Sequence, residues 1–412
     1  MTMRSITCLL ILLFIVSGSF AQKTANPSAV GWWRGLLHRE DGHNIVFNFE
    51  WTTDKGKPVW FFRNAAERIR VTDIQLKKDS VIVQMPLFES QFRLKKSANG
   101  LTGNWIKGGA VKTQVMPVTA SRGGQRFDPG TDAFFDIHGR WSAKFITGNT
   151  YSPAIAEFTQ HINYVTGTFL NPTGDYRYLE GLVSDDSLKL SCFDGSHAYL
   201  FTAKIEDNHT IRKGWFYAGA VHKEEWVAEK NDTATLPSDD AAMYLRPGEE
   251  KLHFSFKDLD GKTVSINDER FKNKVVVVQL MGSWCPNCMD ETAFLSDYYN
   301  RNRQRGIEIV SLAYEYSTDR NRSLKTLKKF QQRFNVQYPM LITGVTVADS
   351  LRTEKTLPEL TPIKFFPSSV VLDKQGRVRK LDTGFNGPGT GEHYLEYKRE
   401  FEDTINRLLR EN

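Results

Sequence analysis

The segment 275–291 reads VVVVQLMGSWCPNCMDE and decides the fold of the C-terminal part of the chain. Its apolar run, Val275–Met281, predicts a strand that is buried on both faces. The small residues after the run predict a turn. Pro286 suits the first turn of a helix, because its missing N–H would have no partner there. Cys285 is then expected at the helix N-terminus, with Cys288 three residues further on the same helix face.

Two cysteines separated by two residues can bind a metal, form a structural disulfide or act as a redox couple. Structural zinc takes about four Cys or His ligands, and none of the nine His pairs at ligand spacing near another Cys. A disulfide that closes so small a loop adds little stability. At a helix N-terminus, by contrast, backbone N–H groups and the helix dipole stabilise a thiolate, the attacking species in disulfide exchange. The pattern favours a redox couple in which Cys285 attacks and the more buried Cys288 resolves the mixed disulfide.

The rest of the C-terminal part alternates between strand-like and helical patterns. Residues 307–314 form a second apolar run, and residues 324–334 have apolar side chains at helical spacing. Residues 368–373 and 377–381 flank a Lys-Gln-Gly turn, which predicts a hairpin. The buried face of a C-terminal helix is marked by Tyr394, Tyr397, Phe401, Ile405 and Leu408. This succession predicts a small α/β domain.

Four features of this part resemble the TlpA/ResA-like thiol-disulfide oxidoreductases of the thioredoxin superfamily. They are the Trp-Cys-x-x-Cys motif after an apolar strand, the acidic Glu291 three positions later, the segment 366–373 followed by Gly376, and the glycine-rich stretch 383–391. The resemblance covers residues 252–412 and implies a thioredoxin-like domain, with a central mixed sheet flanked by helices. It implies an enzyme without a cofactor or metal that reduces disulfides of partner proteins and receives electrons from a membrane thiol donor.

The resemblance also implies roles for residues around the cysteines. Glu291 would be a buried proton acceptor for Cys288, because burial raises the pKa of a carboxyl group. The alternative is an exposed acid favoured by the helix dipole in the first turn, a role that suits the neighbouring Asp290 better. Trp284 would shield the couple and contribute to substrate binding, the alternative being simple packing in the core.

The segment around Pro367 would face the cysteines. The resemblance implies a cis peptide bond before Pro367, with the backbone of Phe366 offered to a substrate chain. Without the resemblance, an ordinary trans turn proline would be expected. The bulky Phe366 departs from the small residue expected at this position and would change the substrate fit. Together with Trp284 and Pro286, these residues form the predicted substrate-binding site.

The N-terminal half has a different pattern. Residues 30–120 and 138–230 are rich in aromatic, β-branched and turn residues. Residues 44–51 alternate strictly, which is typical of a half-buried strand. The same alternation at 188–192 indicates that Cys192 is a small core residue, the alternatives being a third redox thiol or an intermolecular bridge. Several short strands at this spacing predict an all-β sandwich or barrel in front of the α/β domain.

The two β-rich blocks look like copies of one unit, because three short matches recur in the same order at an offset of 107 to 110 residues. The matches pair Gly31-Trp32-Trp33 with Gly139-Arg140-Trp141, Lys78-Asp79-Ser80-Val81 with Asp185-Asp186-Ser187-Leu188, and Gly103-Asn104-Trp105 with Lys213-Gly214-Trp215. Each copy is expected to contribute one sheet to a sandwich or to a shared barrel. The blocks resemble N-terminal extensions of such oxidoreductases in Bacteroidetes-type bacteria. A homodimer through the β region is one use for them, and residues 231–250 are expected to be a linker.

The N-terminus predicts export. Arg4 precedes the apolar run 6–16, and Ser19-Phe20-Ala21 has the small-x-small pattern of a cleavage site, so residues 1–21 are expected to be a secretory signal peptide. The apolar run is too short to span a bilayer, which needs about 20 residues. Removal of Cys8 with the signal leaves too few cysteines for a disulfide framework. We expect a protein of the periplasm or cell envelope with no stable membrane span.

Composition narrows the function only in part. The chain has 412 residues, a formal net charge of +6 and 40% hydrophobic residues, which indicates a globular protein of about two or three domains. Lys and Arg are dispersed, so no nucleic-acid partner is expected. Two hypotheses remain. The first is an exported thiol-disulfide oxidoreductase that acts on protein disulfides in the cell envelope. The second is a ligand- or protein-binding envelope protein whose β-rich region carries the function.

Overall fold

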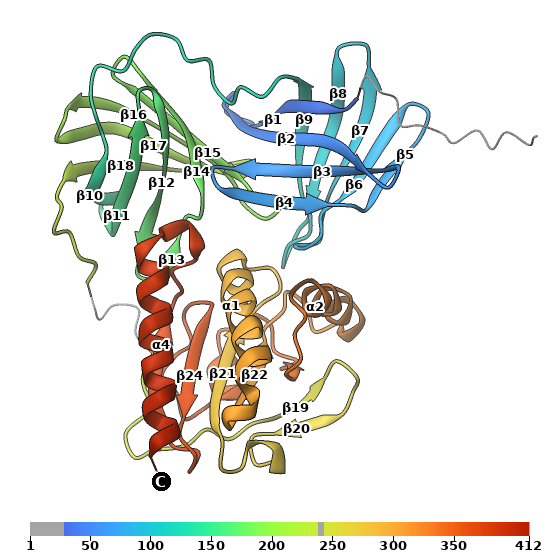
Figure 1. Ribbon diagram of the computed structural model, residues 1–412, viewed down its shortest axis with the longest axis vertical. Coiled ribbons are helices and arrows are strands. Elements are labelled where there is room, and N and C mark those ends of the chain that lie inside the picture. The colour runs from blue at the N-terminus through green and yellow to red at the C-terminus, as the bar shows by residue number, and fades with distance from the viewer. Residues whose placement is uncertain (1–28, 238–242, 412) are drawn as a thin grey trace, which may run out of the picture.

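The computed structural model describes residues 29–237 and 243–411. These residues form three β-sheets (Figure 1). Two sheets lie side by side in the N-terminal half, at the top of the view, and the third lies below them with its helices. The predicted signal peptide, residues 1–21, lies outside the described residues, as does the middle of the predicted linker. Among the described helices, none has the length and apolar character needed to cross a membrane.

The first sheet is an antiparallel meander of nine strands in the order β4-β3-β2-β1-β9-β8-β7-β6-β5. Its strands are β1 (Gly31–His38), β2 (Asn44–Asp54), β3 (Lys57–Asn64), β4 (Glu67–Val71), β5 (Ile74–Leu76), β6 (Ser80–Gln84), β7 (Ser90–Ser97), β8 (Gly100–Lys107) and β9 (Gln114–Arg122). In β2 the predicted face is buried in the core of this sheet, through Ile45, Phe47, Phe49 and Trp51.

The other face of β2 differs from the expectation. Val46 and Asn48 are also buried, so the prediction of a half-buried strand is wrong at these positions. The reason is tertiary, because the segment after β9 contacts Asn48, whose Nδ2 donates a hydrogen bond to the Gly124 carbonyl at 3.1 Å, and the second sheet contacts Val46. Ser191 of the second sheet donates a hydrogen bond from its Oγ to the Val46 carbonyl at 2.7 Å.

The second sheet has the order β11-β10-β18-β17-β16-β15-β14-β12-β13, and it closes into a barrel because β11 also pairs with β12. Its strands are β10 (Gly139–Thr147), β11 (Thr150–His161), β12 (Tyr164–Asn171), β13 (Gly174–Asp175), β14 (Leu179–Ser184), β15 (Ser187–Phe193), β16 (Ala198–Asp207), β17 (Thr210–Ala218) and β18 (His222–Lys230). A separate core, which includes Trp141, Phe169 and Trp226, fills the barrel. Each β-rich block therefore forms its own sheet, and a barrel shared by the two blocks does not form.

Strand β15 joins the two β cores. Cys192 lies in the barrel core, while the next residue, Phe193, packs in the core of the first sheet, with its ring centroid 4.9 Å from that of Phe47. Cys192 is thus the buried core residue that the alternation predicts. The duplication stays a prediction. In its third match Trp105 is fully buried but Trp215 is 36% exposed, so these two residues do not occupy equivalent positions.

The third sheet is mixed, with the order β20-β19-β23-β22-β21-β24-β25. Its strands are β19 (Ser255–Asp258), β20 (Thr263–Ser265), β21 (Val275–Met281), β22 (Ile307–Ala313), β23 (Met340–Ile342), β24 (Ser368–Leu372) and β25 (Val378–Thr383). Every residue of β21 is buried, as its apolar sequence predicts, because Val275 and Val277 face one core and Val276 and Val278 face the core on the other side of the sheet. The strand pairs with parallel β22 on one edge and with antiparallel β24 on the other.

Helices complete the thioredoxin-like domain that the sequence predicts. They are α1 (Pro286–Asn302), α2 (Arg320–Phe334), α3 (Arg352–Thr356) and α4 (Glu392–Arg410), with the short 3-10 segments η1 (Glu269–Phe271), η2 (Arg303–Arg305) and η3 (Pro388–Thr390). Helices α1, α2 and α4 pack on the same face of the sheet, in the core that contains Val275 and Val277. In Figure 1 one end of α1 and one end of α4 lie close to the β region.

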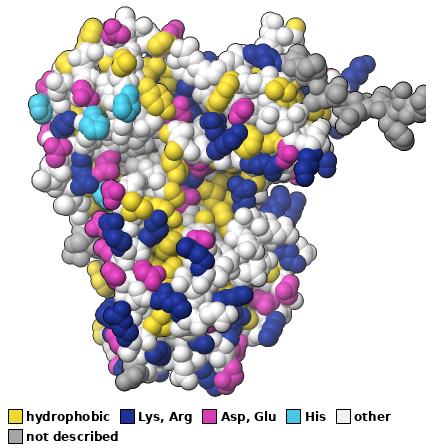
Figure 2. Space-filling view, viewed as in Figure 1, with side chains coloured by type: hydrophobic (Ala, Val, Ile, Leu, Met, Phe, Trp, Pro, Cys, Tyr) yellow, Lys and Arg dark blue, Asp and Glu magenta, His cyan; other side chains and the backbone are white. Residues whose placement is uncertain are grey.

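The α/β domain includes residues that precede its expected start at residue 252. Met243 is buried in the core on the other face of the sheet, and Leu245 forms a bridge with Leu360. Ala234, inside the predicted linker 231–250, packs against Ile155 of the barrel. Single apolar residues in a polar stretch have no periodicity, so the sequence pattern could not place them. On the face shown in Figure 2, Lys and Arg are interspersed with Asp and Glu, and hydrophobic side chains gather near the junction of the β region and this domain.

Candidate active site

The two cysteines lie where β21 ends and α1 begins. Cys285 is the N-cap residue of α1, and its Sγ accepts a hydrogen bond from the backbone N–H of Cys288 at 3.2 Å. Cys285 is 6% exposed and Cys288 is fully buried, and both are free thiols. Burial, and then the neighbouring Cys285, raise the pKa of Cys288 well above its usual value. The arrangement therefore has the asymmetry expected of an attacking and a resolving cysteine.

Glu291 lies three residues after Cys288 on α1 and is only 1% exposed. Its Oε2 accepts a hydrogen bond from Gln279 of β21 at 2.8 Å, while its Oε1 is buried without a hydrogen-bond partner among the described residues. Burial raises the pKa of Glu291 to about 8. A carboxyl group with such a pKa exchanges its proton near neutral pH, which is the property that a proton acceptor needs. The alternative of an exposed first-turn acid is wrong for this residue.

Asp290 also differs from the expectation of an exposed acid in the first turn. Its carboxylate forms an ion pair with Arg177 of the β region, and its side chain is 12% exposed. Burial raises the pKa of Asp290 to about 7, although Arg177 lowers it in part. The surroundings of Asp290 are therefore set by Arg177, a cation from a distant part of the chain, rather than by the helix dipole.

The Phe366–Pro367 peptide bond is cis, as the resemblance implies, and Pro367 is buried. The carbonyl of Phe366 accepts a hydrogen bond from Cys285 Sγ at 3.5 Å, so this carbonyl faces the attacking sulfur. The ring of Phe366 packs edge-on against Trp284, with 5.9 Å between ring centroids. The structure thus brings together the residues predicted for substrate binding and the cysteine that is predicted to attack.

The turn that carries Trp284 is held by the segment after β22. Trp284 Nε1 donates a hydrogen bond to the Tyr314 carbonyl at 2.8 Å, and its ring stacks on Tyr316 with 5.3 Å between centroids. The buried carboxylate of Glu315 accepts hydrogen bonds from the N–H and the Oγ of Ser283, at 2.8 and 2.6 Å. The half-buried Trp284 therefore has a fixed orientation beside the cysteines.

The β region covers the cysteine motif directly. Arg177 Nη1 donates a hydrogen bond to the Pro286 carbonyl at 3.4 Å, and Asn287 Nδ2 donates one to the Asp175 carbonyl at 3.4 Å. Ser196 Oγ donates a third, to the Trp284 carbonyl at 3.4 Å. Pro286 is buried as a result. These contacts make the barrel a wall of the active site rather than a distant extension.

Arg177 lies at the junction of all three sheets and is 1% exposed. It forms ion pairs with Glu67 of the first sheet, Asp194 of the barrel and Asp290 of α1. Asp175 adds a further carboxylate, so several carboxylates surround one guanidinium. Buried charges of this kind are stable only while they are paired, so Arg177 ties the three sheets together at the site.

A cavity of about 460 Å³ opens beside Cys285. Trp284, Tyr316 and Phe366 line it from the α/β domain, together with the cysteine. The β region lines it with Lys107, Tyr176, His197, Tyr199, Phe216 and His222, among others. A cavity of this size and aromatic character is typical of a binding site for a small molecule or a few residues of a chain.

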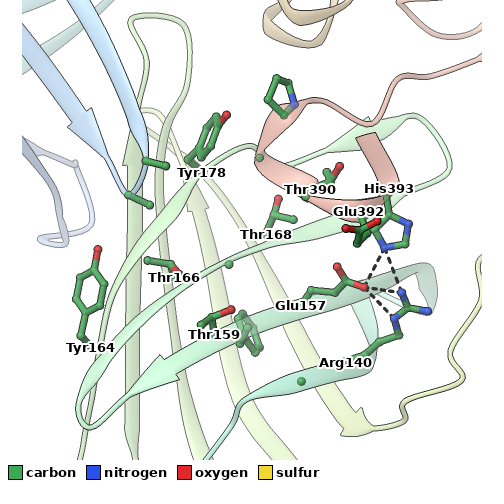
Figure 3. Close-up of a pocket in the computed structure, with 18 residues that line it drawn as sticks. Arg140, Glu157, Thr159, Tyr164, Thr166, Thr168, Tyr178, Thr390, Glu392 and His393 are labelled. Atoms are coloured by element: carbon green, nitrogen blue, oxygen red, sulfur yellow. Dashed lines mark hydrogen bonds and ion pairs between the residues drawn. The ribbon is translucent and has the colours of Figure 1, made fainter. Parts of the chain in front are cut away.

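A larger cavity, of about 760 Å³, lies between β10, β11, β12 and the start of α4 (Figure 3). Arg140, Glu157 and His393 point toward one another at one side of it. Glu157 Oε1 accepts a hydrogen bond from Arg140 Nε at 2.8 Å and lies 2.9 Å from His393 Nε2. None of the residues predicted for catalysis or substrate binding lines this cavity.

Sequence reasoning missed Lys107, Arg177, His197, His222 and Gln279. The first four are many residues away from the cysteines along the chain and belong to no motif. Gln279 stands in the apolar run before the motif, and its polarity there is the only signal among the five. A polar side chain in the middle of a buried strand needs a buried partner, which here is Glu291.

Comparisons with known proteins agree with this geometry. Residues 246–396 match the Redoxin family model. The thiol-disulfide oxidoreductase ResA of Bacillus thuringiensis subsp. konkukian is 26% identical over 149 residues, which are 36% of this chain and 76% of ResA. The ResA protein of Bacillus subtilis is 23% identical over 140 residues, which are 34% of this chain and 69% of its own.

Solved structures give similar matches. A thiol:disulfide interchange protein of the thioredoxin family from Chlorobium tepidum is 22% identical, with a TM-score of 0.31, and covers 40% of this chain and 99% of its own. A thiol-disulfide oxidoreductase from Bacteroides fragilis is 18% identical, with a TM-score of 0.28. The match covers 37% of this chain and 99% of the Bacteroides chain. The family match and the ResA relatives thus show a Redoxin domain in the C-terminal region of this chain, of the thiol-disulfide oxidoreductase type.

Proposed function

We propose that the protein is an exported reductase of protein disulfides that works in the periplasm or cell envelope. The observation that carries the proposal is the position of Cys285 at the N-terminus of α1. Its Sγ accepts the N–H of the buried Cys288, and the Phe366 carbonyl before cis-Pro367 lies beside it. This places an attacking sulfur next to a buried resolving sulfur and a carbonyl that can face a substrate chain, which is the arrangement that disulfide exchange needs.

The first step is attack by the Cys285 thiolate on one sulfur of a substrate disulfide. The S–S bond of the substrate breaks, and its other sulfur leaves as a thiolate that takes up a proton. A mixed disulfide now joins Cys285 to the substrate. Trp284 and the backbone of Phe366 would hold the substrate chain during this step, with Pro286 fixing the start of the helix.

The second step is attack by Cys288 on Cys285 Sγ, which breaks the mixed disulfide and releases the substrate with both sulfurs reduced. Two electrons have then passed to the substrate, and a Cys285–Cys288 disulfide remains. Cys288 must lose its proton to attack, and the buried Glu291 is the proposed acceptor. At its pKa of about 8, about a tenth of Glu291 is ionised at pH 7, and the fraction grows as the pH rises.

A dithiol donor must reduce the Cys285–Cys288 disulfide before the next cycle, and we place a membrane thiol carrier in this role. The predicted signal peptide in residues 1–21 supports a location outside the cytoplasm. Neither the cysteine chemistry nor the residues around it require a bound cofactor or metal.

The first test is the midpoint potential of the cysteine pair, measured from tryptophan fluorescence in dithiothreitol redox buffers. A potential near or below about −220 mV supports a reductant, whereas one near about −120 mV would make the protein an oxidant or isomerase. The variant Cys288→Ser should accumulate the mixed disulfide with a test substrate, visible by intact mass. Cys192→Ala is the control, because Cys192 lies in the barrel core and should not affect trapping.

The alternative function, ligand binding by the β-rich region, also has a place in the structure. The 760 Å³ cavity of Figure 3 is large enough for a small ligand, and its lining includes no cysteine. A chain with Cys285→Ser and Cys288→Ser tests it in a cell that lacks the wild-type protein. If this redox-inactive chain restores the lost phenotype, the β-rich region carries the function and the reductase proposal is wrong.

A further inference from the structure

The cavity beside Cys285 has walls from all three sheets. Lys107 ends β8 of the first sheet, and His197 and His222 belong to the barrel, while Trp284 and Phe366 belong to the α/β domain. A hydrogen-bond chain connects these parts. Lys107 Nζ donates to the Ser196 carbonyl at 2.8 Å, and Ser196 Oγ donates to the Trp284 carbonyl. A substrate that reaches the sulfur of Cys285 must therefore pass side chains of the β region.

The carboxylates near this cavity already have partners. Asp175 accepts the N–H of Arg177 at 2.6 Å with one oxygen and the N–H of Gly387 at 2.7 Å with the other. Asp194, behind the wall, accepts the backbone N–H groups of Ser196 and His197 and forms an ion pair with Arg177. Both carboxylates are therefore paired within the protein, although the charge of Asp194 also acts on Lys107.

Lys107, the lysine in the wall of the cavity, differs from these carboxylates because it forms no direct ion pair among the described residues. Lys107 is half-buried, and burial lowers the pKa of its ammonium group. Within the described part of the chain it forms no ion pair, and its one hydrogen-bond acceptor is the uncharged Ser196 carbonyl. The buried Asp194 acts on this charge from behind the wall, but Asp194 is itself paired with Arg177 and His197. A desolvated ammonium that forms no direct ion pair gains from an anion that enters the cavity. His222, also in the wall, lies 3.9 Å from Glu224.

We propose that this composite cavity selects the substrate, and that it takes a disulfide with a carboxylate close to its sulfur, the carboxylate lying at Lys107. This inference rests on the proposed function, which it deepens by naming the class of substrate. Aromatic side chains from both parts, including Tyr199 and Trp284, would pack on the chain next to the disulfide.

The size of the cavity limits how the disulfide can be presented. At about 460 Å³ it holds a small molecule or a few extended residues, and Cys285 is only 6% exposed. A disulfide on the surface of a compact domain could not reach the sulfur without displacing the β region. The feature that a substrate must have is an accessible disulfide with a carboxylate close to its sulfur. A small acidic disulfide such as glutathione disulfide has this feature, and so does an acidic segment in an extended or unfolded chain.

The test uses full-length, pre-reduced protein in single-turnover reactions, so that no electron donor is needed. Each turnover oxidises Cys285 and Cys288 to a disulfide and reduces one probe disulfide to two thiols. The probes are two symmetrical peptide disulfides that differ only in Glu or Gln beside the cysteine, and glutathione disulfide. For the wild type we expect the Glu probe to react about tenfold faster than the Gln probe at low salt, because a charge-assisted hydrogen bond is gained.

The readout is the ratio of the Glu to the Gln rate constants, since it does not depend on how much protein is active. The ratio should fall to near one in Lys107→Gln and persist in Lys107→Arg, which keeps the charge. Lys96→Gln is the matched control. Lys96 is an exposed lysine of the same sheet that also donates to a backbone carbonyl, that of Lys77 at 2.8 Å, but it does not line the cavity.

The outcomes separate the two proposals. If the wild type reduces none of the probes, the proposed reductase function fails. If the peptide probes react at equal rates, or the preference for Glu survives in Lys107→Gln, and the rate with glutathione disulfide is also unchanged in Lys107→Gln, the reductase function stands and the selection by Lys107 is overturned. Dependence on Lys107 with glutathione disulfide alone would assign the cavity to a small acidic thiol compound, and with the Glu peptide it would assign the cavity to a chain segment.

Discussion

The guanidinium of Arg177, just after β13 of the barrel, forms an ion pair with the carboxylate of Asp290 on the helix that begins at the reactive cysteines. The same guanidinium reaches the Pro286 carbonyl, between the two cysteines. The β region and the redox helix therefore share one buried charge cluster. A substitution in the β region that breaks these contacts is therefore expected to alter the surroundings of the cysteines.

Loss of Arg177 should destabilise the protein strongly. In Arg177→Met several carboxylates, including Asp290 and Asp194, would lose the cation that compensates them, and breaking a buried ion pair in this way costs about 3–5 kcal/mol. The measurement is the free energy of unfolding in urea. The control is Arg301→Met, which breaks an exposed pair with Asp297 on the same helix and should cost about 0–1 kcal/mol. Equal losses in the two variants would show that Arg177 is not a structural centre.

Gly174 should not tolerate a side chain. Its φ is +139°, and a Cβ atom would lie 2.1 Å from Asn287 Nδ2 and 2.9 Å from the Phe385 carbonyl. We expect Gly174→Ala to push the barrel away from the cysteine motif, at a cost of about 1–3 kcal/mol, and to speed the alkylation of Cys285. Gly148→Ala is the control, because Gly148 also has a positive φ, of +59°, but open space around it. An unchanged alkylation rate in Gly174→Ala would mean that the barrel does not shield the thiol.

Glu291 should make stability fall as the pH rises. Its pKa is about 8 in the folded protein and about 4.3 in an unfolded chain, so the folded state binds more protons between these values. The free energy of unfolding should therefore decrease from about pH 5 to about pH 8 through this group. In Glu291→Gln this decrease disappears, and the variant should gain stability over the wild type toward alkaline pH. Parallel stability curves for the two proteins would contradict the raised pKa.

The substitution Glu291→Gln should affect release of the mixed disulfide but not its formation. If Glu291 accepts the proton of Cys288, release of the mixed disulfide should accelerate as the pH rises toward about 8, and this rise should be lost in Glu291→Gln, because a neutral amide accepts no proton. Formation of the mixed disulfide by Cys285 should change little. Stopped-flow measurement of both phases over this pH range is the check, and an unchanged pH profile of the second phase would remove Glu291 from the mechanism.

Cys192 should be inert in the native protein. It is fully buried in the barrel core, and burial raises the pKa of its thiol well above the usual value. Iodoacetamide without denaturant should label Cys285 and leave Cys192 unmodified, whereas labelling in urea should reach both. Intact mass followed by peptide mapping measures this. Rapid native labelling of Cys192 would mean that the barrel opens or that Cys192 is a third redox thiol.

Local patterns predicted much of the α/β domain. The apolar run of β21, the hairpin of β24 and β25 and the amphipathic face of α4 are all found where the sequence indicates them. Each of these depends on residues that are close in the chain, so its pattern is visible without knowledge of the rest. The buried face of β2 was predictable for the same reason, while the burial of Val46 on the other face was not, because it depends on contact with Ser191.

The sequence by itself determined the redox motif, its place at the start of a helix and the all-β character of the N-terminal half, since strand and helix periods and helix-terminus chemistry are local properties. Only the tertiary structure decided that Lys107, Arg177 and His197 belong to the site, and that Asp290 is paired rather than exposed. The physical reason is that ion pairs and cavity walls join residues far apart in the chain. No spacing or period in one sequence records which distant charges meet when the sheets pack.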